Sequence, residues 1–209
     1  MSSGRFITFE GIEGVGKSTQ LALLAVALER AGREVVATRE PGGTPLAERI
    51  RALVLHDRSE PVPVAGELLL MFAARAVHTE NLIRPALARG AWVLCDRYTD
   101  ATYAYQGGGR GIPDGELAPL AALAQRGLEP DLTLLLDAPV ASALARARGR
   151  GAGADRIEGE TAAFFERVRA RYLERAGRAG GRVKVIDATA PVEDVAVAVR
   201  RAADALGVP

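Results

Sequence analysis

Five short apolar runs alternate with helical patterns along the chain, and this alternation most limits the folds that the sequence can adopt. The runs have the composition of strands and cover Phe6–Phe9, Glu34–Thr38, Ala91–Cys95, Asp131–Leu136 and Val183–Ile186. Strands separated by helices form parallel sheets, because a parallel pair needs a crossover connection. We therefore predict an α/β protein with three layers, in which a five-stranded parallel sheet is flanked by helices.

Helices are predicted in the stretches between these strands. They cover Thr19–Ala31, Thr44–Leu55, Val64–Arg89, Asp114–Arg126, Val140–Arg148, Glu160–Ala176 and Val192–Leu206. The third is expected to break near Pro85 or earlier, because proline lacks the N–H group that a helix interior requires. The glycine-rich segment Gln106–Gly111 is interpreted as a loop.

Composition places the chain among ordinary globular proteins. Its 209 residues favour a single domain, 1–209, and 48% hydrophobic with 25% charged residues is sufficient for a packed core. The net charge of +1 argues against bulk attraction to nucleic acid or a membrane, so neither is expected as a partner. The single cysteine, Cys95, excludes an intrachain disulfide and a four-cysteine zinc site. Because the apolar runs are also too short to span a bilayer, we expect a cytoplasmic protein.

The strongest chemical signal follows the first predicted strand and opens the first helix. The segment reads Gly11-Ile12-Glu13-Gly14-Val15-Gly16-Lys17-Ser18 and fits G-x-x-x-x-G-K-[ST], the phosphate-binding P-loop. Its glycines let backbone N–H groups surround phosphate oxygens at a helix N-terminus. In such a loop Lys17 would reach the β- and γ-phosphates of a nucleotide, and Ser18 would hold Mg²⁺.

Two further segments have the chemistry of a nucleotide site. Asp96 ends the third predicted strand, where a second carboxylate on the Mg²⁺ side is expected. Arg146, Arg148 and Arg150 alternate before a glycine-rich stretch, which predicts a cationic lid at about 146–156 that closes over a polyphosphate. A solvated surface loop is the alternative, because arginine greatly outnumbers lysine throughout this chain.

Glu13 is unusual, because a carboxylate inside a phosphate-binding loop repels the triphosphate. It needs a compensating role, either on the metal side or as a partner for a polar group across the cleft. A sugar hydroxyl of a second substrate would be such a group. A loop acid that points away from the site is the alternative.

A P-loop predicts nucleotide binding but not the class of protein. The guanine-reading motif N-K-x-D is absent, because the single asparagine, Asn81, is followed by leucine. Asp96 is followed by Arg97 rather than by a second, water-activating acid, which favours transfer to a bound acceptor over hydrolysis. These features predict a kinase of small molecules, with a nucleotide-dependent binding switch as the non-enzymatic alternative.

The chain resembles the thymidylate kinases of bacterial type from about Arg5 to the last helix. The resemblance rests on segments at 9–14, 39–44, 73–75, 96–98, 104–112, 130–133 and 155–158. It implies a P-loop kinase fold that transfers the γ-phosphoryl group of ATP to dTMP. The product, dTDP, would supply dTTP synthesis for DNA replication. The resemblance also implies Mg²⁺ as cofactor and a homodimer, for which the apolar helices at 64–89 and 116–126 are candidate surfaces. Another nucleoside monophosphate kinase on the same fold is the alternative enzyme.

The resemblance also implies roles for residues on the donor side. The implied ATP-binding residues are Gly11, Ile12, Glu13, Gly14, Val15, Gly16, Lys17, Ser18, Thr19 and Arg146. The implied metal contacts are Ser18, Asp96 and Glu13, and the implied catalytic residues are Lys17, Arg97, Arg148, Arg150 and Glu13.

On the acceptor side, the resemblance implies a contact between Glu13 and the deoxyribose 3′-hydroxyl. Arg97 would hold the dTMP phosphate, and Arg75 would read the edge of thymine. Tyr105 would crowd C2′ of the sugar and so disfavour a ribonucleotide. The implied dTMP-binding residues are Glu13, Arg39, Arg51, Met71, Phe72, Arg75, Arg97, Tyr105 and, as polar base contacts, Thr102 and Gln106.

The chain departs from the family pattern at two places. Met71 stands where the family usually has phenylalanine, one helical turn before Arg75, and Phe72 is shifted by one, so either side chain could cover the thymine. Gly14 stands where some members carry an arginine, which leaves the lid arginines to offset charge on the transferred phosphoryl group. His78, one helical turn from Arg75, is interpreted as a helix-surface residue. A catalytic role for it is not required, because phosphoryl transfer depends mostly on positioning and electrostatics.

Overall fold

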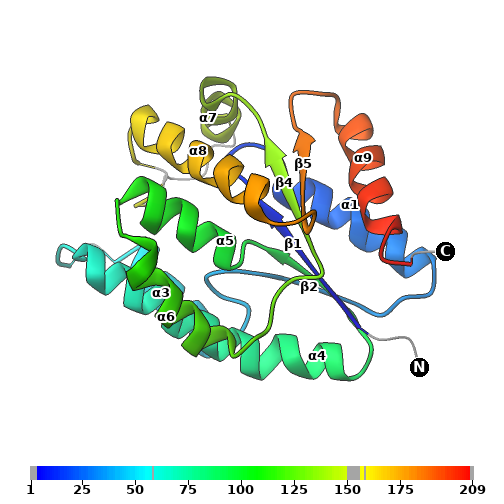
Figure 1. The fold of residues 1–209 in the computed structure, drawn as a ribbon, viewed down its shortest axis with the longest axis horizontal. Helices are drawn as coiled ribbons and strands as arrows, with labels where there is room; N and C mark the ends of the chain where they lie inside the picture. The colour runs from blue at the N-terminus through cyan, green and yellow to red at the C-terminus, as the bar shows by residue number, and fades with distance from the viewer. Residues whose placement is uncertain (1–3, 58, 150–155, 158, 208–209) are drawn as a thin grey trace.

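The computed structural model describes residues 4–57, 59–149, 156–157 and 159–207. Five strands form one parallel sheet in the order β2-β3-β1-β4-β5, drawn in Figure 1. The strands are β1 (Arg5–Glu10), β2 (Val35–Arg39), β3 (Trp92–Asp96), β4 (Leu132–Asp137) and β5 (Val183–Asp187). Each strand overlaps its predicted run closely, and the predicted five-stranded parallel sheet flanked by helices is confirmed.

Helices cover both faces of the sheet. They are α1 (Lys17–Arg30), α2 (Pro45–Leu55), α3 (Val64–His78), α4 (Arg84–Ala88), α5 (Thr99–Thr102), α6 (Asp114–Gln125), α7 (Val140–Arg148), α8 (Ala162–Arg178) and α9 (Val192–Asp204), with π-helical segments η1 (Thr79–Ile83) and η2 (Tyr103–Gly109). Helices α1 and α9 lie side by side on one face, and α4 and α8 contact the sheet from the other (Figure 1). No helix in the described part of the chain is long and apolar enough to cross a membrane.

Strand β1 shows how the two faces differ. Successive side chains of a strand point to opposite faces of the sheet. Ile7 and Phe9 belong to the core that contains the apolar residues of α1 and α9, whereas Phe6 packs in a second cluster with residues of η1, α4 and β3. On the same side as Phe6, the alternation places two polar residues, Thr8 and Glu10, and both are fully buried. Such burial is rare for a glutamate, which identifies this face as the polar side of the core.

Two helical regions differ in detail from the predictions. The helix predicted over 64–89 is interrupted by the wider turn of η1, which ends just before Pro85 and so lies where that residue cannot donate a hydrogen bond. The prediction of a loop over Gln106–Gly111 is wrong, because α5 continues into η2 as far as Gly109. The glycines there allow η2 to pack against α8: a Cβ atom on Gly108 would lie 2.6 Å from Cβ of Arg171.

The carboxyl ends of β1, β2 and β3 form a single edge of the sheet. The register pairs Asp96 of β3 with Phe9 of β1 on one side and with Arg39 of β2 on the other. The P-loop follows β1 directly, so it emerges at this edge beside the segments that follow β2 and β3. In open α/β sheets ligands bind at this end of the strands.

Candidate active site

A cavity of about 230 Å³ opens at this edge of the sheet. Its walls come from the P-loop, the end of β2, α2, α3, and the segment from Asp96 through η2. The residues on these walls that the sequence predicted as functional are Glu13, Gly14, Gly16, Lys17, Ser18, Arg39, Arg51, Met71, Arg75, Asp96, Arg97, Thr102, Tyr105 and Gln106. One cavity therefore gathers residues predicted for the donor side and for the acceptor side.

The P-loop has the backbone of a phosphate-binding turn. Gly14 has φ 78°, and Gly16, the N-cap of α1, has φ 93°, which non-glycine residues rarely adopt. A Cβ atom on Gly14 would also collide with the carbonyl oxygen of Ala143 in α7, so no side chain fits at this position. The loop leads directly into the N-terminus of α1, where backbone N–H groups and the helix dipole favour an anion.

Lys17 lies in the cavity wall and folds back onto the loop. Its Nζ atom donates a hydrogen bond to the carbonyl oxygen of Ile12 at 2.9 Å. Burial, followed by the charge of Arg97, lowers the pKa of Lys17 from 10.5 to about 8. The lysine is therefore a desolvated cation that an anionic phosphate would stabilise.

Ser18 and Asp96 both line the cavity and contact each other. Oγ of Ser18 donates a hydrogen bond to Oδ2 of Asp96 at 2.9 Å. The other carboxylate oxygen of Asp96 is buried and has no hydrogen-bond partner among the described residues. An unpaired buried carboxylate oxygen beside a serine hydroxyl is a donor set that fits Mg²⁺, which takes one or two carboxylates together with substrate phosphates and water. The described residues contain no cluster of three His, Cys, Asp or Glu ligands, so any metal here would share its coordination with a nucleotide.

Glu13 points into the cavity and binds two side chains of the opposite wall. Its Oε1 atom accepts a hydrogen bond from Nη2 of Arg97 at 2.8 Å, and the Tyr105 hydroxyl lies 2.8 Å and 2.7 Å from its two oxygens. The guanidinium of Arg97 also lies 4.8 Å from the centroid of the Tyr105 ring. Burial raises the pKa of Tyr105 well above its ordinary value, so its hydroxyl remains a donor.

Arg75 is held on the floor of the acceptor end by three groups. Its Nε atom donates to Oε2 of Glu40 at 2.7 Å, Nη1 donates to Oγ1 of Thr102 at 2.8 Å, and Nη2 donates to the carbonyl oxygen of Tyr98 at 3.0 Å. The side chain is buried, yet it lines the cavity. A buried guanidinium with this many partners is oriented before a ligand arrives.

The comparison with known proteins decides the family. The family model described as "Thymidylate kinase" matches residues 9–199. The chain belongs to the thymidylate kinase family. A thymidylate kinase of Chromohalobacter salexigens is 58% identical over 196 residues, which cover 93% of this chain and 92% of that protein. One from Pseudomonas entomophila is 58% identical over 204 residues, which cover 98% of this chain and 95% of that protein.

A solved structure of the same family has the same fold. The crystal structure of thymidylate kinase from Ehrlichia chaffeensis gives a TM-score of 0.78 at 33% sequence identity, covering 97% of this chain and 99% of that chain. The predicted activity is thereby confirmed: the chain is an ATP-dependent kinase that phosphorylates dTMP to dTDP.

In this thymidylate kinase, Met71 and Phe72 lie on different sides of α3. Met71 lines the cavity, whereas Phe72 is buried in a cluster with Leu68 and residues of α6. The Phe72 ring lies 5.1 Å from the Arg75 guanidinium. Of the two candidates for covering the thymine, the structure therefore places Met71 at the cavity, and Phe72 behind Arg75.

Other predicted acceptor residues are tied to carboxylates or carbonyls around the cavity. Nε2 of Gln106 donates to Oε1 of Glu67 at 2.7 Å. Arg39 pairs with Glu48 at 3.0 Å, and Arg51 donates to the carbonyl oxygen of Pro41 at 2.9 Å. Of the predicted ATP-binding residues, Gly11, Ile12, Val15, Thr19 and Arg146 do not line this cavity.

The predicted lid lies only partly within the described residues. Arg148 is exposed at the C-terminal end of α7, and Nη1 of Arg146 donates to the carbonyl oxygen of Ala188 at 2.9 Å. Arg150, with residues 151–155, lies outside the described residues. At the far end of the segment Arg156 pairs with Glu67 at 2.8 Å, and Ile157 lines the cavity.

Sequence reasoning missed several buried partners of the site. The interpretation of His78 as a helix-surface residue is wrong, because its side chain is 0% exposed. Its Nδ1 atom lies 3.0 Å from Oε1 of Glu40, and its Nε2 atom lies 2.8 Å from Oγ1 of Thr38. The spacing of Arg75 and His78, one helical turn apart, was the available signal, since such residues share a helix face.

Proposed function

We propose that dTMP binds in this cavity with its phosphate at Arg97 and its base at Arg75, beside the β- and γ-phosphates of ATP in the P-loop. The observation that carries the proposal is the shared cavity: Lys17, Arg97 and Arg75 all line it, and all three are cations with buried surroundings. A cation in a desolvated site interacts with a phosphate far more strongly than one in water. The arrangement suits a donor and an acceptor phosphate that meet between Lys17 and Arg97.

Phosphoryl transfer depends mostly on positioning and on charge stabilisation. In the proposed arrangement Lys17 gives up its bond to the Ile12 carbonyl and binds the phosphates of ATP, whose negative charge stabilises the charged form of the lysine. Arg97 turns one edge of its guanidinium from Glu13 to the acceptor phosphate. Glu13 is then available for the deoxyribose 3′-hydroxyl, with Tyr105 beside the sugar. Met71, Thr102 and Gln106 complete the proposed thymine pocket.

We include Mg²⁺ in the proposal, held by Ser18 and Asp96, because the unpaired Oδ1 atom of Asp96 fits such an ion. When bound together with ATP, Mg²⁺ would offset the negative charge of the phosphates during transfer. The protein groups in this corner contribute orientation: Ser18 opens α1, and Asp96 ends β3, so both are held by regular secondary structure. The metal-side contact of Glu13 stays a prediction, and in this structure its two oxygens are hydrogen-bonded to Arg97 and Tyr105 instead.

We also propose that 1–209 acts as one P-loop kinase domain whose segment at about 146–156 serves as the lid. No side chain fits at Gly14, so the P-loop itself supplies no arginine to the transferred phosphoryl group. Arg148 and Arg150 then supply that charge, and arginine suits the role because its planar fork binds phosphate oxygens in pairs. The exposed position of Arg148 at the end of α7 leaves it able to move toward the site.

A homodimer is part of the proposal, with α3 and α6 as its surface. Leu69 of α3 is 57% exposed and Leu123 of α6 is 75% exposed, although α3 and α6 pack against each other. Exposed large apolar residues on adjoining helices are typical of a protein contact. Light scattering after gel filtration would detect the dimer, and Leu123→Glu should shift it to monomer. The cytoplasmic location stays a prediction from the sequence.

A panel of nucleoside monophosphates tests the proposed function directly. With ATP and Mg²⁺ present, ADP release should be fastest with dTMP. A clear preference for a different nucleoside monophosphate would contradict the assignment of the thymine pocket. Absence of ADP release with every acceptor would contradict kinase activity and favour a nucleotide-dependent binding switch.

A further inference from the structure

Arg97 occupies a strained backbone position. Its φ is 73°, in the left-handed region that favours glycine, and its N–H donates to the carbonyl oxygen of Phe9 at 2.9 Å. A non-glycine residue holds this conformation only where the surrounding structure enforces it, and such positions cluster at functional sites. Here the turn directs the Arg97 side chain from the end of β3 into the cavity.

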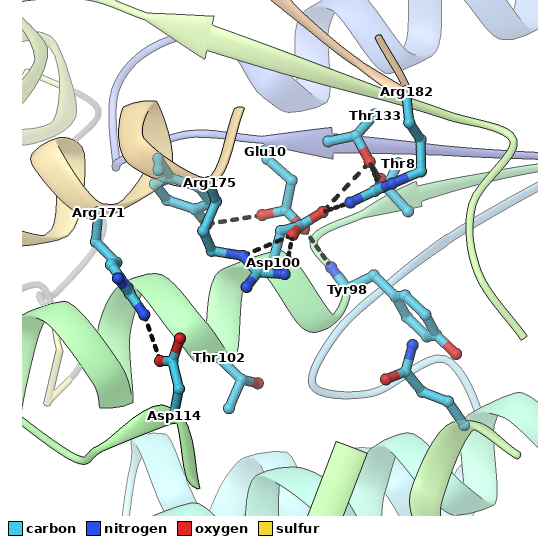
Figure 2. Close-up of polar contacts among 12 residues, drawn as sticks. Thr8, Glu10, Tyr98, Asp100, Thr102, Asp114, Thr133, Arg171, Arg175 and Arg182 are labelled. Atoms are coloured by element: carbon cyan, nitrogen blue, oxygen red, sulfur yellow. Dashed lines mark hydrogen bonds and ion pairs between the residues drawn. The ribbon is translucent and has the colours of Figure 1, made fainter. Parts of the chain in front are cut away.

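Glu10 holds this turn from the neighbouring strand. It is the last residue of β1 and is fully buried, and its Oε1 atom accepts a hydrogen bond from the N–H of Tyr98 at 2.7 Å. Figure 2 shows the Glu10 carboxylate facing the Tyr98 amide. Because the Tyr98 amide belongs to the peptide unit directly after Arg97, Glu10 fixes the backbone on the C-terminal side of the strained residue.

Tyr172 of α8 connects Glu10 to the guanidinium of Arg97. Its hydroxyl donates to Oε2 of Glu10 at 2.7 Å and accepts from Nη1 of Arg97 at 3.3 Å. The carboxylate of Glu10 thus acts on the backbone of Arg97 through one oxygen and on its guanidinium through the other. Neither Glu10 nor Tyr172 lines the cavity, so neither residue would touch the substrate.

Burying the carboxylate of Glu10 costs free energy, so this residue does more than fill space in the core. Burial, followed by the charge of Asp100, raises the pKa of Glu10 from 4.5 to about 7. Asp100 is itself paired with Arg175 at 2.7 Å and with Arg182 at 3.0 Å (Figure 2). An apolar side chain would fill the same space without this cost, so the carboxylate is retained for the two hydrogen bonds that it accepts.

We propose that Glu10 and Tyr172 position Arg97 for the acceptor phosphate, which makes Glu10 a positioning residue of the transfer reaction. The proposal rests on the proposed function, because it takes Arg97 as the ligand of the dTMP phosphate. The loss should therefore fall on recognition of the phosphate and leave recognition of the nucleoside unchanged.

Titration with dTMP and with thymidine separates these two contributions, because thymidine has the same base and sugar but no phosphate. Tyr172→Phe keeps the ring and removes the hydroxyl. It should weaken dTMP binding about tenfold, the usual effect of one hydrogen bond to a charged group, and leave thymidine binding unchanged. Glu10→Gln keeps the shape and one acceptor and should show the same selective loss. Tyr103→Phe is the matched control, since its ring lies against Arg175 outside the cavity, and it should bind both ligands normally.

The same titrations in an Arg97→Ala background show whether Tyr172 acts through Arg97. The Tyr172→Phe change should then have no further effect on dTMP affinity, whereas an equal effect in both backgrounds would overturn the proposal. Circular dichroism verifies that each variant is folded. If Tyr172→Phe does not fold, the same comparison is made with Glu10→Gln.

The outcomes also separate this inference from the proposed function. If Arg97→Ala keeps the full preference for dTMP over thymidine, the proposed phosphate site is wrong. If Arg97→Ala loses the preference while Tyr172→Phe and Glu10→Gln both keep it, the phosphate site holds and only the positioning role of Glu10 is overturned.

Discussion

Nε of Arg75 donates a hydrogen bond to Oε2 of Glu40 at 2.7 Å, and both side chains are almost completely buried, at 4% and 3% exposure. The second carboxylate oxygen of Glu40 lies 3.0 Å from Nδ1 of His78. The arginine proposed to read the thymine edge is therefore held by a carboxylate that is itself held by a histidine. Such a pair depends on both members, because removal of one leaves the other charge buried without a partner.

Glu40→Gln should therefore destabilise the protein and weaken dTMP binding together. Breaking a buried ion pair costs about 3–5 kcal/mol in the free energy of unfolding, and loss of orientation at Arg75 should raise the KM for dTMP. Urea unfolding and steady-state kinetics measure the two effects. Glu80→Gln is the control, because Glu80 pairs with Arg84 on an exposed helix surface, where the loss should be below about 1 kcal/mol. Equal losses in the two variants would contradict the account.

The parts of the site that could be predicted from sequence are those encoded locally. The P-loop residues occur in one continuous segment between a strand and a helix, so motif and context specify their geometry together. Asp96 ends an apolar strand, where a second carboxylate on the Mg²⁺ side is expected, and the structure has it hydrogen-bonded to Ser18 at 2.9 Å. Both inferences need only strand order and direction.

The buried polar partners could not be predicted, because they join residues that are distant in sequence. The contact between Glu40 and Arg75 depends on the rotation of α3 about its axis, and the contact between Glu10 and Tyr172 depends on how α8 packs against the sheet. Local patterns carry no information on these packing angles. The glycines at Gly108 and Gly109 were misinterpreted for the same reason, since their small size serves the contact between η2 and α8 rather than a turn.

Arg148 and Arg150 should supply the positive charge that offsets the negative charge of the transferred phosphoryl group. The double change Arg148→Ala with Arg150→Ala should lower kcat by at least about 10², because an arginine at this point of the reaction contributes 10³–10⁵ in rate. The KM for dTMP should change little, since Arg97 and Arg75 hold the acceptor. The melting temperature should also change little, because Arg148 is exposed and an exposed charge contributes little to stability. A defect confined to dTMP affinity would place the catalytic arginine elsewhere.

Tyr105 should control the choice of sugar through its ring. Tyr105→Ala should narrow the preference for dTMP over its 2′-hydroxylated counterpart by about tenfold or more, by improving the ribonucleotide. Tyr105→Phe removes only the hydroxyl that binds Glu13 and should keep the preference. Ratios of kcat/KM for the two acceptors measure the effect. If Tyr105→Ala lowered kcat/KM for both acceptors by the same factor, the ring would have only a packing role.

Glu10 should make stability depend on pH between about 4.5 and 7. Its pKa is about 7 in the folded protein and 4.5 ordinarily, so the folded state holds the proton more tightly. The free energy of unfolding should then fall as pH rises through this window, by about 3 kcal/mol from this group, with the loss complete above pH 7. Urea unfolding of Glu10→Gln should show a correspondingly flatter profile. Glu29→Gln, on the exposed side of α1, controls for the loss of one carboxylate, and equal slopes in wild type and Glu10→Gln would contradict the assignment.

The most direct measurement is a crystal structure of the protein with dTMP bound. The account predicts the phosphate within hydrogen-bonding distance of the Arg97 guanidinium, and the thymine edge at Arg75. It also predicts the Met71 side chain over the thymine ring, with Phe72 still packed in the cluster behind Arg75. A nucleotide bound outside this cavity, or bound within it with the phosphate away from Arg97, would contradict the central claim.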